Sequence, residues 1–515
     1  MSVDILRPRL IGVLLGLLAA ISGIALTTPP ADGADRVYWA NFVSDKISYA
    51  NIDGSGGVMQ LNTSGATADE PIGLAIDPVG GRVYWANHTG GKISWANLDG
   101  SGGGDLATGS ATVSGPASVS VDVAARTIYW LNDGADKISW AKLDGSGGGD
   151  LSIGAASIDL PGALAVFPSA GRVYWTNWGF IGSGWISYAN LDGSGGATLP
   201  VAGATLDTPF GMGIDAAAGR LYWVNANPGI VSYANLDGSG ASDLDDRGLE
   251  IKGPYGLALD PEAGRVYLAN TVADTLAFVR LDETGGATLP FQLETNSAPN
   301  FPALLKSPGG RSAPAISRSE VTRKFVKAKR GVRPPKRRPP SQIVGVRLQC
   351  SPGSWAGDLV EAFLYQAPLS TTTQWLRDGQ PIAGATSASI TTTEAGNYRC
   401  SETAKNHAGA TAQLSSVAAF FKVGGAKLNR RRGTARLAVV LPPDGLLTLR
   451  GRGIAGRRTG ASGARKLTIK AKGRKKRTLT KTGKVRVGAT LNFITAEAPP
   501  VSQNVTLALR KRLRR

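Results

Sequence analysis

His88 and His407 are the only two histidines in the 515-residue chain. They are far apart in the sequence, so they predict neither a histidine cluster for a metal ion nor a His–Asp pair that would activate a nucleophile. Most hydrolase mechanisms are excluded on this basis. The other groups that could do chemistry are carboxylates and aromatic rings, in short segments that differ between otherwise similar phrases.

Each variable segment follows a phrase of the form RVYWAN. The segments are FVSD from residue 42, HTGG from 88, DGAD from 133, WGFIGSGW from 178, ANPG from 226 and TVAD from 271. Exposed aromatic rings among carboxylates are typical of binding surfaces. The predicted ligand-binding residues are Asp45, His88, Asp133, Asp136, Trp178, Phe180, Trp185 and Asp274. The alternative is that these aromatic rings only cover the edge of their own structural unit.

The surrounding phrases form a repeat. Their tyrosines are Tyr38, Tyr84, Tyr129, Tyr174, Tyr222 and Tyr267, with spacings of 46, 45, 45, 48 and 45 residues. A phrase such as KISWANLDGSG follows each tyrosine, and a phrase such as PIGLAIDP precedes five of them. A period of this length indicates an array of structural units.

Each unit is predicted to be a four-stranded antiparallel sheet. Runs of aromatic and β-branched residues alternate with Gly, Asp, Asn and Pro, and Asp99-Gly100 suits a tight hairpin turn. Six sheets around an axis make a β-propeller. The first unit lacks its inner strand, and the segment NFPALLKSP, around Pro302 to Ser307, is predicted to supply it and so remove the open edges of the ring.

These motifs resemble the six-bladed YWTD propeller of the low-density lipoprotein receptor family, over residues 35–307. One position departs from that family, because an amide replaces its acidic residue at Asn41, Asn87, Asn132, Asn177, Asn225 and Asn270. We expect residues common to all blades to serve packing, and function to reside where blades differ. The variable segments and the connections between blades open on the same face, and the resemblance implies that this face binds a protein ligand.

Four carboxylates support an alternative function. Asp77, Asp122, Asp215 and Asp260 end the predicted inner strands. Some propellers use carboxylates in the central channel to hold a divalent ion for lactonase or lyase chemistry. Such an enzyme would lose its metal and its activity when Asp122 or Asp215 is replaced. Their regular recurrence favours a structural role, so the main prediction is a protein without catalytic residues, metal or cofactor.

Residues 1–34 have the pattern of a secretory signal peptide. Arg7 and Arg9 precede an apolar run from Leu10 to Leu26, and small residues follow up to Ala34. The sequence therefore predicts a secreted or cell-surface protein, of the bacterial type. The run is also long enough to remain as an uncleaved anchor, and no later run is long enough to span a bilayer.

Residues 308–342 are basic and proline-rich, and they are predicted to be an extended, solvated linker. Cys350 and Cys400 follow, and two cysteines in an exported chain predict one disulfide. Together with Trp375, and with Tyr398 two residues before the second cysteine, they resemble the immunoglobulin sandwich. This domain is predicted to cover residues 343–424.

Residues 425–515 alternate in the manner of strands and predict a small basic β-sandwich. The chain from Asp35 to Ser307 has 14 basic and 28 acidic residues, whereas the chain from Pro308 onward has 41 and 8. Such a field attracts polyanions. The segments RKKR from 474 and RKRLRR from 510 lack interleaved aromatic rings, so nucleic acid is not the expected partner.

The sequence as a whole predicts an all-β, non-catalytic recognition or adhesion protein. Its propeller would bind protein or glycan, and its basic tail would associate with anionic cell-envelope polymers or lipid headgroups. Two alternatives for the tail are equally compatible with the sequence: a merely solvated surface, and contact with the acidic propeller of the same chain.

Overall fold

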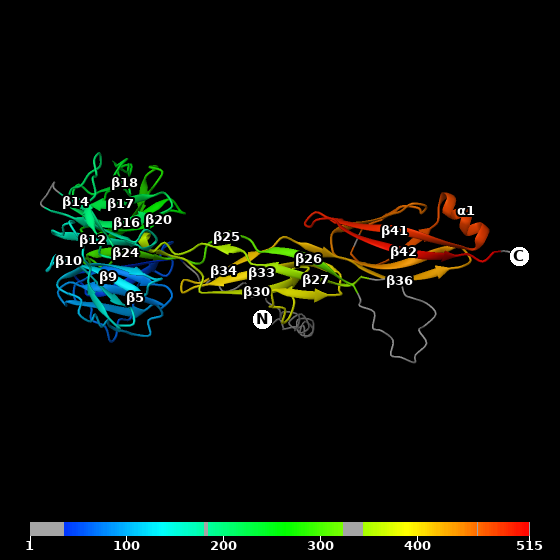
Figure 1. The fold of residues 1–515 in the computed structure, drawn as a ribbon, viewed down its shortest axis with the longest axis horizontal. Coiled ribbons are helices and arrows are strands. Elements are labelled where there is room, and N and C mark those ends of the chain that lie inside the picture. The colour runs from blue at the N-terminus through cyan, green and yellow to red at the C-terminus, as the bar shows by residue number, and fades with distance from the viewer. Residues whose placement is uncertain (1–34, 180–183, 323–342, 461, 514–515) are drawn as a thin grey trace, which may run out of the picture.

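The structure is a computed structural model that describes residues 35–179, 184–322, 343–460 and 462–513. Within these ranges the chain consists of β-strands with a single α-helix, so the predicted all-β fold is confirmed. Figure 1 shows three parts in a row: a ring of sheets, a middle module and a terminal module. The predicted signal peptide, residues 1–34, lies outside the described residues.

The ring consists of antiparallel sheets whose strands follow one another from the inside outward. The sheets are β24 (Pro299–Leu305), β1 (Arg36–Asn41), β2 (Lys46–Asn51) and β3 (Val58–Gln60); β4 (Pro71–Asp77), β5 (Arg82–Asn87), β6 (Lys92–Asn97) and β7 (Gly103–Asp105); β8 (Pro116–Asp122), β9 (Thr127–Asn132), β10 (Lys137–Lys142) and β11 (Gly148–Asp150); β12 (Pro161–Phe167), β13 (Arg172–Asn177), β14 (Trp185–Asn190) and β15 (Gly196–Thr198); β16 (Pro209–Asp215), β17 (Arg220–Asn225), β18 (Ile230–Asn235) and β19 (Ser242–Asp243); and β20 (Pro254–Asp260), β21 (Arg265–Asn270), β22 (Thr275–Arg280) and β23 (Gly286–Thr288). A short 3₁₀ turn, η1 (Pro168–Ala170), follows β12.

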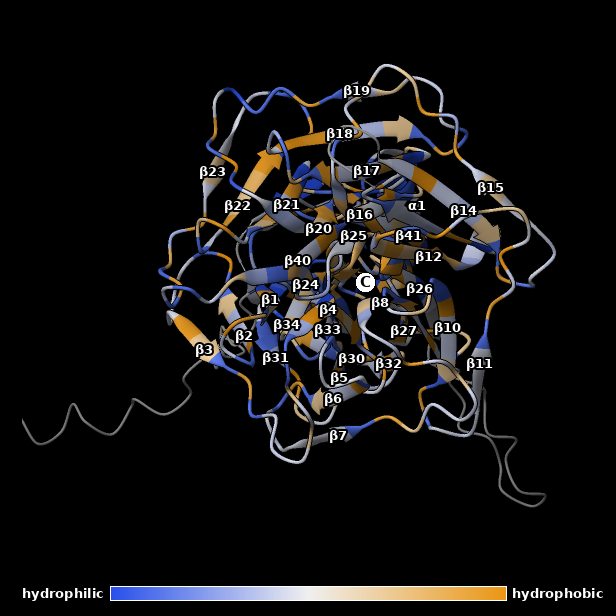
Figure 2. Ribbon diagram, turned by 90° about the vertical axis from the view of Figure 1, so that its left-hand side faces the viewer, coloured by the Kyte–Doolittle hydropathy of each residue, from blue (hydrophilic) through white to orange (hydrophobic). Residues whose placement is uncertain are grey.

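These sheets are the blades of a β-propeller. The inner strands β24, β4, β8, β12, β16 and β20 contact one another in a closed cycle. Figure 2, which looks along the long axis, shows the outer strands at the rim of the ring. The second strand of each sheet is packed between neighbouring sheets, which explains why its RVYWAN-type sequence is apolar on both faces.

The ring closes by pairing its last strand with its first. β24 pairs antiparallel with β1, and Arg36 lies opposite Leu305. The predicted contribution of the segment after the sixth repeat is therefore confirmed. Closure covers the edge of β1, which would otherwise expose unpaired backbone groups.

The middle module has two main sheets and a two-stranded ribbon. They consist of β26 (Ala315–Thr322), β27 (Ile343–Ser351) and β32 (Ser389–Thr392); β31 (Gln380–Pro381), β30 (Ser370–Arg377), β33 (Gly396–Lys405) and β34 (Ala410–Leu414), with β35 (Ala418–Phe420) also on β33; and β25 (Gly310–Ser312) with β28 (Ser354–Trp355).

Part of the predicted linker belongs to this module. Residues 310–322 form β25 and β26, and β26 pairs with β27 from Ala315 to Thr322. The prediction of a solvated linker is wrong for these residues. Their alternating pattern AISRSEVT suits a strand, and Ile316 packs on the core of the module. Residues 323–342, the rest of the predicted linker, lie outside the described residues.

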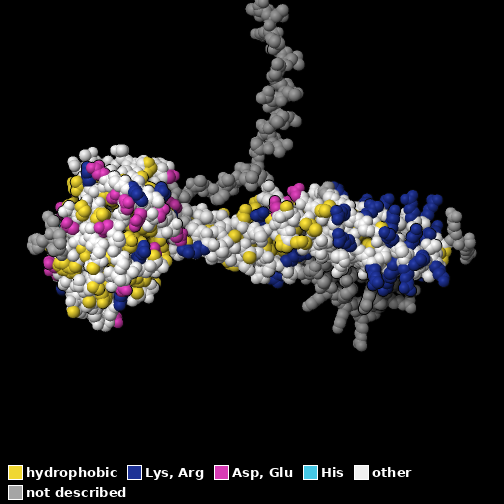
Figure 3. Space-filling model, turned by 90° about the horizontal axis from the view of Figure 1, so that it is seen from above, with side chains coloured by type: hydrophobic (Ala, Val, Ile, Leu, Met, Phe, Trp, Pro, Cys, Tyr) yellow, Lys and Arg dark blue, Asp and Glu magenta, His cyan; other side chains and the backbone are white. Residues whose placement is uncertain are grey.

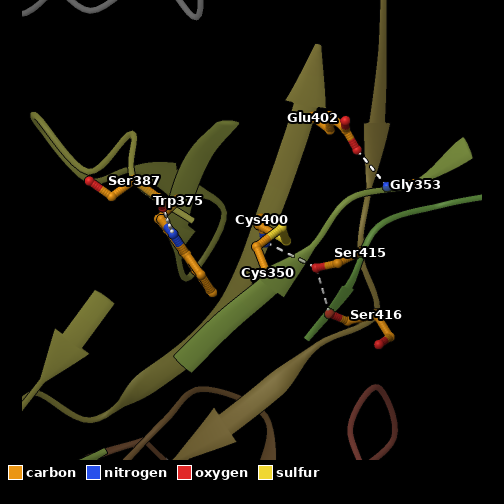
Figure 4. Close-up of a disulfide and its surroundings, with 8 residues drawn as sticks. All are labelled: Cys350, Gly353, Trp375, Ser387, Cys400, Glu402, Ser415 and Ser416. Carbon is orange, nitrogen blue, oxygen red and sulfur yellow. Dashed lines mark hydrogen bonds between the residues drawn. A yellow bond between two sulfur atoms is a disulfide. The ribbon is translucent and has the colours of Figure 1, made fainter. Parts of the chain in front are cut away.

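The predicted disulfide is present between Cys350 and Cys400 and joins the two main sheets. Figure 4 shows Trp375 beside it. The indole is fully buried and donates from Nε1 to the carbonyl of Ser387 at 2.9 Å. The Tyr398 hydroxyl donates to the carbonyl of Glu394 at 2.8 Å, so both aromatic residues satisfy their polar atoms while they pack on the disulfide.

A loop of the middle module enters the propeller. This loop, residues 356–366, is named the plug here; it contains the 3₁₀ turn η2 (Val360–Ala362) and the strand β29 (Leu364–Tyr365). β29 adds in parallel to the inner strand β24, and η2 contacts β8, β12, β16 and β20. Phe363, Leu364 and Tyr365 belong to the hydrophobic core of the propeller. The sequence did not predict this plug.

The terminal module consists of two sheets and a helix. Its elements are β36 (Lys422–Asn429), β37 (Thr434–Leu441) and β40 (Gly463–Lys470); β39 (Arg457–Thr459), β38 (Gly445–Arg450), β41 (Lys484–Thr495) and β42 (Val501–Arg510); and α1 (Gly473–Thr482).

Two features of this module differ from the prediction. Phe421 already packs in the terminal core, so that core begins before the predicted boundary at residue 425. The helix α1 was not predicted, because GRKKRTLTKT has no apolar period and buries only Leu479. It ends at Gly483, whose left-handed conformation lets its N–H bond the carbonyl of Leu479. No helix in the described ranges is long and apolar enough to cross a membrane.

We expect removal of the disulfide by Cys350→Ala with Cys400→Ala to destabilise the middle module. The bridge closes a loop of 50 residues, and the chain-entropy model gives about 4 kcal/mol for a loop of that length. Hydrogen exchange of β33 should become faster in the double variant. A reducing agent should have the same effect on the native chain and none on the variant, and unchanged exchange in β33 would contradict the prediction.

Candidate binding face of the propeller

The amide common to all blades has a structural role. The six asparagines after the YW phrase are at most 3% exposed. In the third blade Asn132 accepts hydrogen bonds from Trp130 Nε1 at 3.2 Å and from the backbone N–H of Ser114 at 2.9 Å. Its Nδ2 donates to the carbonyl of Lys137 and to Ser139 Oγ. Asn132 therefore ties the connection between blades to two strands, and both of its polar atoms have partners within the protein. In the sixth blade Asn270 Nδ2 donates to Thr275 Oγ1 instead.

The plug determines which face of the propeller is open. We name the face with the turns between first and second strands proximal, and the face with the variable segments distal. The backbone N–H of Ile76, at the proximal end of β4, donates to the Tyr365 hydroxyl at 3.2 Å. The backbone N–H of Lys306, just after β24, donates to the carbonyl of Tyr365. The proximal mouth of the channel is thus filled, and Figure 1 shows the distal face at the free end of the molecule.

Two carboxyl groups of the plug are shielded from solvent, with Glu361 buried and Asp358 half-buried. Asp358 accepts from the N–H groups of Gln366 and Ala367 at 2.7 and 2.8 Å, but its burial raises its pKa. Burial also raises the pKa of Glu361, and the nearby Asp215 adds to this effect. Burial therefore favours the protonated forms of both groups in the folded chain.

His88 lies on the distal face between two carboxylates. Its Nε2 is 3.5 Å from Asp133 Oδ2, and its Nδ1 is 3.9 Å from Glu70 Oε2. Glu70, which the sequence did not single out, also bonds the hydroxyl of Thr89. The structure thus brings together two predicted residues, His88 and Asp133, on neighbouring blades. This polar group is partly exposed and available to a ligand.

Three predicted carboxylates lie at turn positions. Asp45, Asp136 and Asp274 have φ of 54°, 50° and 48°, and Asp is among the side chains that tolerate this conformation. Asp45 accepts from the N–H of Glu70 at 2.7 Å. Asp274 accepts from the N–H groups of Asn296 and Ala298. Asp45 and Asp274 therefore fasten the connections between blades, whereas Asp136 is exposed.

The aromatic part of the site extends beyond the predicted segment. Trp178 stacks on Phe210 at 5.9 Å between ring centroids, and Phe210 contacts Tyr255 at 4.3 Å. These three half-buried rings, named the aromatic row here, come from the distal ends of three successive blades. Trp185 Nε1 donates to Ser157 Oγ, so this ring lies beside the connection that leads into its own blade. Phe180 lies outside the described residues.

The sequence held a signal for Phe210 and Tyr255. Both occupy the second position of an inner strand, in PFGMGID and PYGLALD. The corresponding residues of three other blades are smaller: Ile72, Ala117 and Gly162. The aromatic row is thus another place where blades differ. It could be found only by comparing the inner strands as well as the loops.

The carboxylates at the ends of the inner strands have partners. Asp122 and Asp215 each accept from a backbone N–H three residues later, at 2.9 and 3.0 Å. Asp260 pairs with Lys306, and Asp77 pairs with Arg126. Within the described ranges no group of three or more His, Cys, Asp and Glu residues could hold a metal ion. These four residues stabilise turns and junctions.

The terminal module forms a second charged region. Figure 3 shows Lys and Arg side chains crowded at the end opposite the propeller. From residue 427 to 512, no described Lys or Arg has a carboxylate within 4.0 Å. The middle module lies between this region and the acidic propeller (Figure 1). Contact of the basic tail with the propeller of the same chain, one of the two alternatives for the tail, is therefore not observed.

No protein-family model matches the chain, and no curated protein matches it. Solved structures do resemble part of it. The crystal structure of a nidogen/laminin complex is 20% identical and covers 52% of this chain and 98% of the matched chain, with a TM-score of 0.45. Hydrazine synthase from Kuenenia stuttgartiensis is 13% identical over 51% of this chain and 80% of that chain, with a TM-score of 0.35. The propeller fold of this chain rests on its own strand pairing.

Asn132→Asp should destabilise the propeller by about 1–3 kcal/mol, because a carboxylate in this place cannot donate to the Lys137 carbonyl. Ser139 cannot compensate, since its hydroxyl already donates to Asp150. Urea unfolding followed by tryptophan fluorescence measures the change. Asp136→Asn, an exposed exchange of the same two groups, is the control. Equal stability of Asn132→Asp and the native protein would contradict the proposed role of the amide.

Glu361→Gln should make stability less dependent on pH. Burial raises the pKa of Glu361 in the folded chain, so its contribution is complete below the unfolded value of about 4.3 and is lost as pH rises through the folded pKa. Between about pH 4 and 8 the free energy of unfolding should therefore fall less in the variant than in the native protein. Glu497→Gln, at an exposed site, serves as the control. Parallel pH profiles for the Glu361 variant and the native protein would contradict this.

Proposed function

We propose that this protein is an exported, non-catalytic recognition protein. In this proposal its ring is a six-bladed propeller of the YWTD type that binds a protein or glycan on the distal face. The disulfide-linked middle module is an immunoglobulin-like spacer. The basic terminal module associates with anionic polymers of the cell envelope, and residues 1–34 direct export.

The aromatic row carries this proposal. Trp178, Phe210 and Tyr255 present half-buried rings on the face that the plug leaves open. Aromatic anchors of this kind supply much of the binding energy at interfaces, because they bury a large area with few rotatable bonds. The polar group of His88, Glu70 and Asp133 lies on the same face and would add directional contacts.

The middle module suits the role of a spacer because both of its ends are packed. The plug joins it to the propeller core, and Asn406 Nδ2 also donates to the carbonyl of Lys306 at 2.8 Å. At the other end Ala419 of β35 packs in the core of the terminal module, and Arg399 Nη2 lies 3.4 Å from Glu497 Oε2. These contacts support a fixed separation between the distal face and the basic module.

The terminal module is suited to polyanions rather than to one small ligand. Its cations lie on the helix, as with Arg474 and Lys475, and on strands, as with Lys466 and Arg486. Arginine binds phosphate, sulfate and carboxylate groups through two parallel hydrogen bonds. Many such contacts along one polymer would add up, and they would weaken as salt screens them.

The proposal is tested by the binding of fluorescently labelled full-length protein to isolated cell envelopes of the source organism, as NaCl rises from about 0.05 to about 0.5 M. The distal variant is Phe210→Ala with Tyr255→Ala, and its control is Tyr188→Ala, a half-buried aromatic elsewhere on the propeller. The basic variant replaces Arg474, Lys475, Lys476 and Arg477 by Ser.

We expect the basic variant to lose binding that salt removes, and the distal variant to lose about tenfold in the affinity that persists in salt. The Tyr188 control should bind like the native protein. Envelope binding that neither variant changes, or a Tyr188 control that loses as much as the distal variant, would contradict the proposal.

A further inference from the structure

The third blade departs from most of the other blades at two neighbouring positions of one edge, and it alone has a cation at both. Arg126 stands in the turn where Gly81, Gly171, Gly219 and Gly264 stand in other blades. Lys142 ends the third strand where four other blades have Asn51, Asn97, Asn190 and Asn235 and the sixth blade has Arg280. Repeats of one chain are an internal standard for what the fold requires. The fold does not require these two cations, so they point to a role beyond packing.

Both cations line a groove between the second and third blades. The groove has a volume of about 640 Å³ and includes Gly80, Arg82 and Trp95 on one side and Arg126 and Lys142 on the other. This size falls within the range of about 300–1,000 Å³ that is typical of small-molecule sites. It lies on the proximal side of the ring, apart from the aromatic row and the terminal module.

Arg126 is held in place by an adaptation of the neighbouring blade. Its Nη1 is 2.6 Å from Oδ1 of the buried Asp77, and its backbone φ is 52°. The position of Gly80 is Ala in the other turns, at Ala125, Ala170, Ala218 and Ala263. A Cβ on Gly80 would overlap the Asp77 carboxylate and lie 3.2 Å from Arg126 Nη2. The second blade thus makes room for a residue of the third.

The other cations are positioned but not neutralised. Lys142 Nζ donates to Thr127 Oγ1 at 2.9 Å and to the carbonyl of Ala125 at 3.2 Å. The Arg82 guanidinium lies 3.6 Å from the centre of the Trp95 ring. In the described chain neither Arg82 nor Lys142 has a carboxylate within 4.0 Å.

Two carboxylates also line the groove, and both have partners. Asp105 pairs with Lys92 at 2.6 Å, and Asp144 accepts from the N–H of Ser146 at 2.9 Å. Lys92 therefore balances the charge of Asp105, and Asp144 bonds within its own hairpin. The groove keeps an excess of positive charge on a propeller that is acidic overall.

We propose that this groove binds a small anionic ligand, of the size of one or two sugar units, through a phosphate, sulfate or carboxylate group. Arg82 and Arg126 offer planar guanidinium edges that bond such groups in pairs, and Lys142 adds a point charge. The apolar rim of Leu106, Ala107 and Leu143 would contact the body of the ligand. This site is separate from the recognition role proposed for the distal face.

Calorimetric titration of the full-length protein tests the site, with pyrophosphate, glucuronate and neutral glucose as probes at about 0.15 M NaCl, where exposed charges are screened. The groove variant is Arg126→Gly with Lys142→Asn, which introduces residues that four other blades have at these positions and so is expected to fold. Lys142→Asn alone is the milder second variant. Lys252→Asn with Arg347→Asn removes one Lys and one Arg at exposed positions outside both the groove and the terminal module, and is the matched control.

We expect the native protein to have an anion site that is about tenfold weaker in the groove variant and unchanged in the Lys252 and Arg347 control. Stronger binding of pyrophosphate or of glucuronate identifies the anionic group. Unchanged anion binding in both groove variants would overturn the proposal, as would an equal loss in the Lys252 and Arg347 control. Glucose binding as strong as glucuronate binding would also overturn it, because it would show that charge is not recognised.

Discussion

The insertion of the plug into the proximal mouth of the propeller is the contact on which the arrangement of the molecule depends. β29 extends a blade by backbone hydrogen bonds, and Phe363, Leu364 and Tyr365 join the propeller core. Backbone pairing fixes the direction of the plug relative to the blade, and burial of apolar side chains stabilises the contact. The junction therefore fixes how the middle module is oriented on the propeller. It occupies one face of the ring and leaves the distal face, with its aromatic row, for a partner.

The repeats separate what the fold needs from what it does not. The buried Trp–Asn–Ser network recurs in most blades because it satisfies polar groups at the connection between blades. The sixth blade has Leu268 and Ala277 in place of its Trp and Ser. Other departures from the repeat fall into two groups at different places. Phe210 and Tyr255 add aromatic rings to the distal face. Arg126 and Lys142 add positive charge to the groove between the second and third blades. Neither group follows from the requirements of packing.

Local patterns in the sequence predicted the strands, the closure by β24 and the disulfide, because each depends on residues a short distance along the chain or on a pair of cysteines. The plug could not be predicted in this way. Its apolar run LVEAFLY resembles any buried loop or strand, and only the assembled ring creates the mouth that it fills. Asp45 and Asp274 were predicted to bind a ligand because they are charged. Their positive φ, which Asp tolerates, explains instead why Asp occurs at these turn positions. The strand from Ala315 to Thr322 was not predicted because the sequence around it is basic and proline-rich.

The elongated arrangement of the three modules also accounts for how strongly opposite charges can coexist in one chain. An acidic propeller and a basic module on a flexible linker would attract each other and neutralise both surfaces. The strand β30 has eight residues and runs along the long axis of the middle module (Figure 1), and at about 3.3 Å per residue it spans roughly 26 Å. This exceeds the Debye length of about 8 Å at physiological salt, so the two surfaces are screened from each other. The packed junctions at Tyr365 and Ala419 maintain that distance, and each end therefore remains available to a partner of opposite charge.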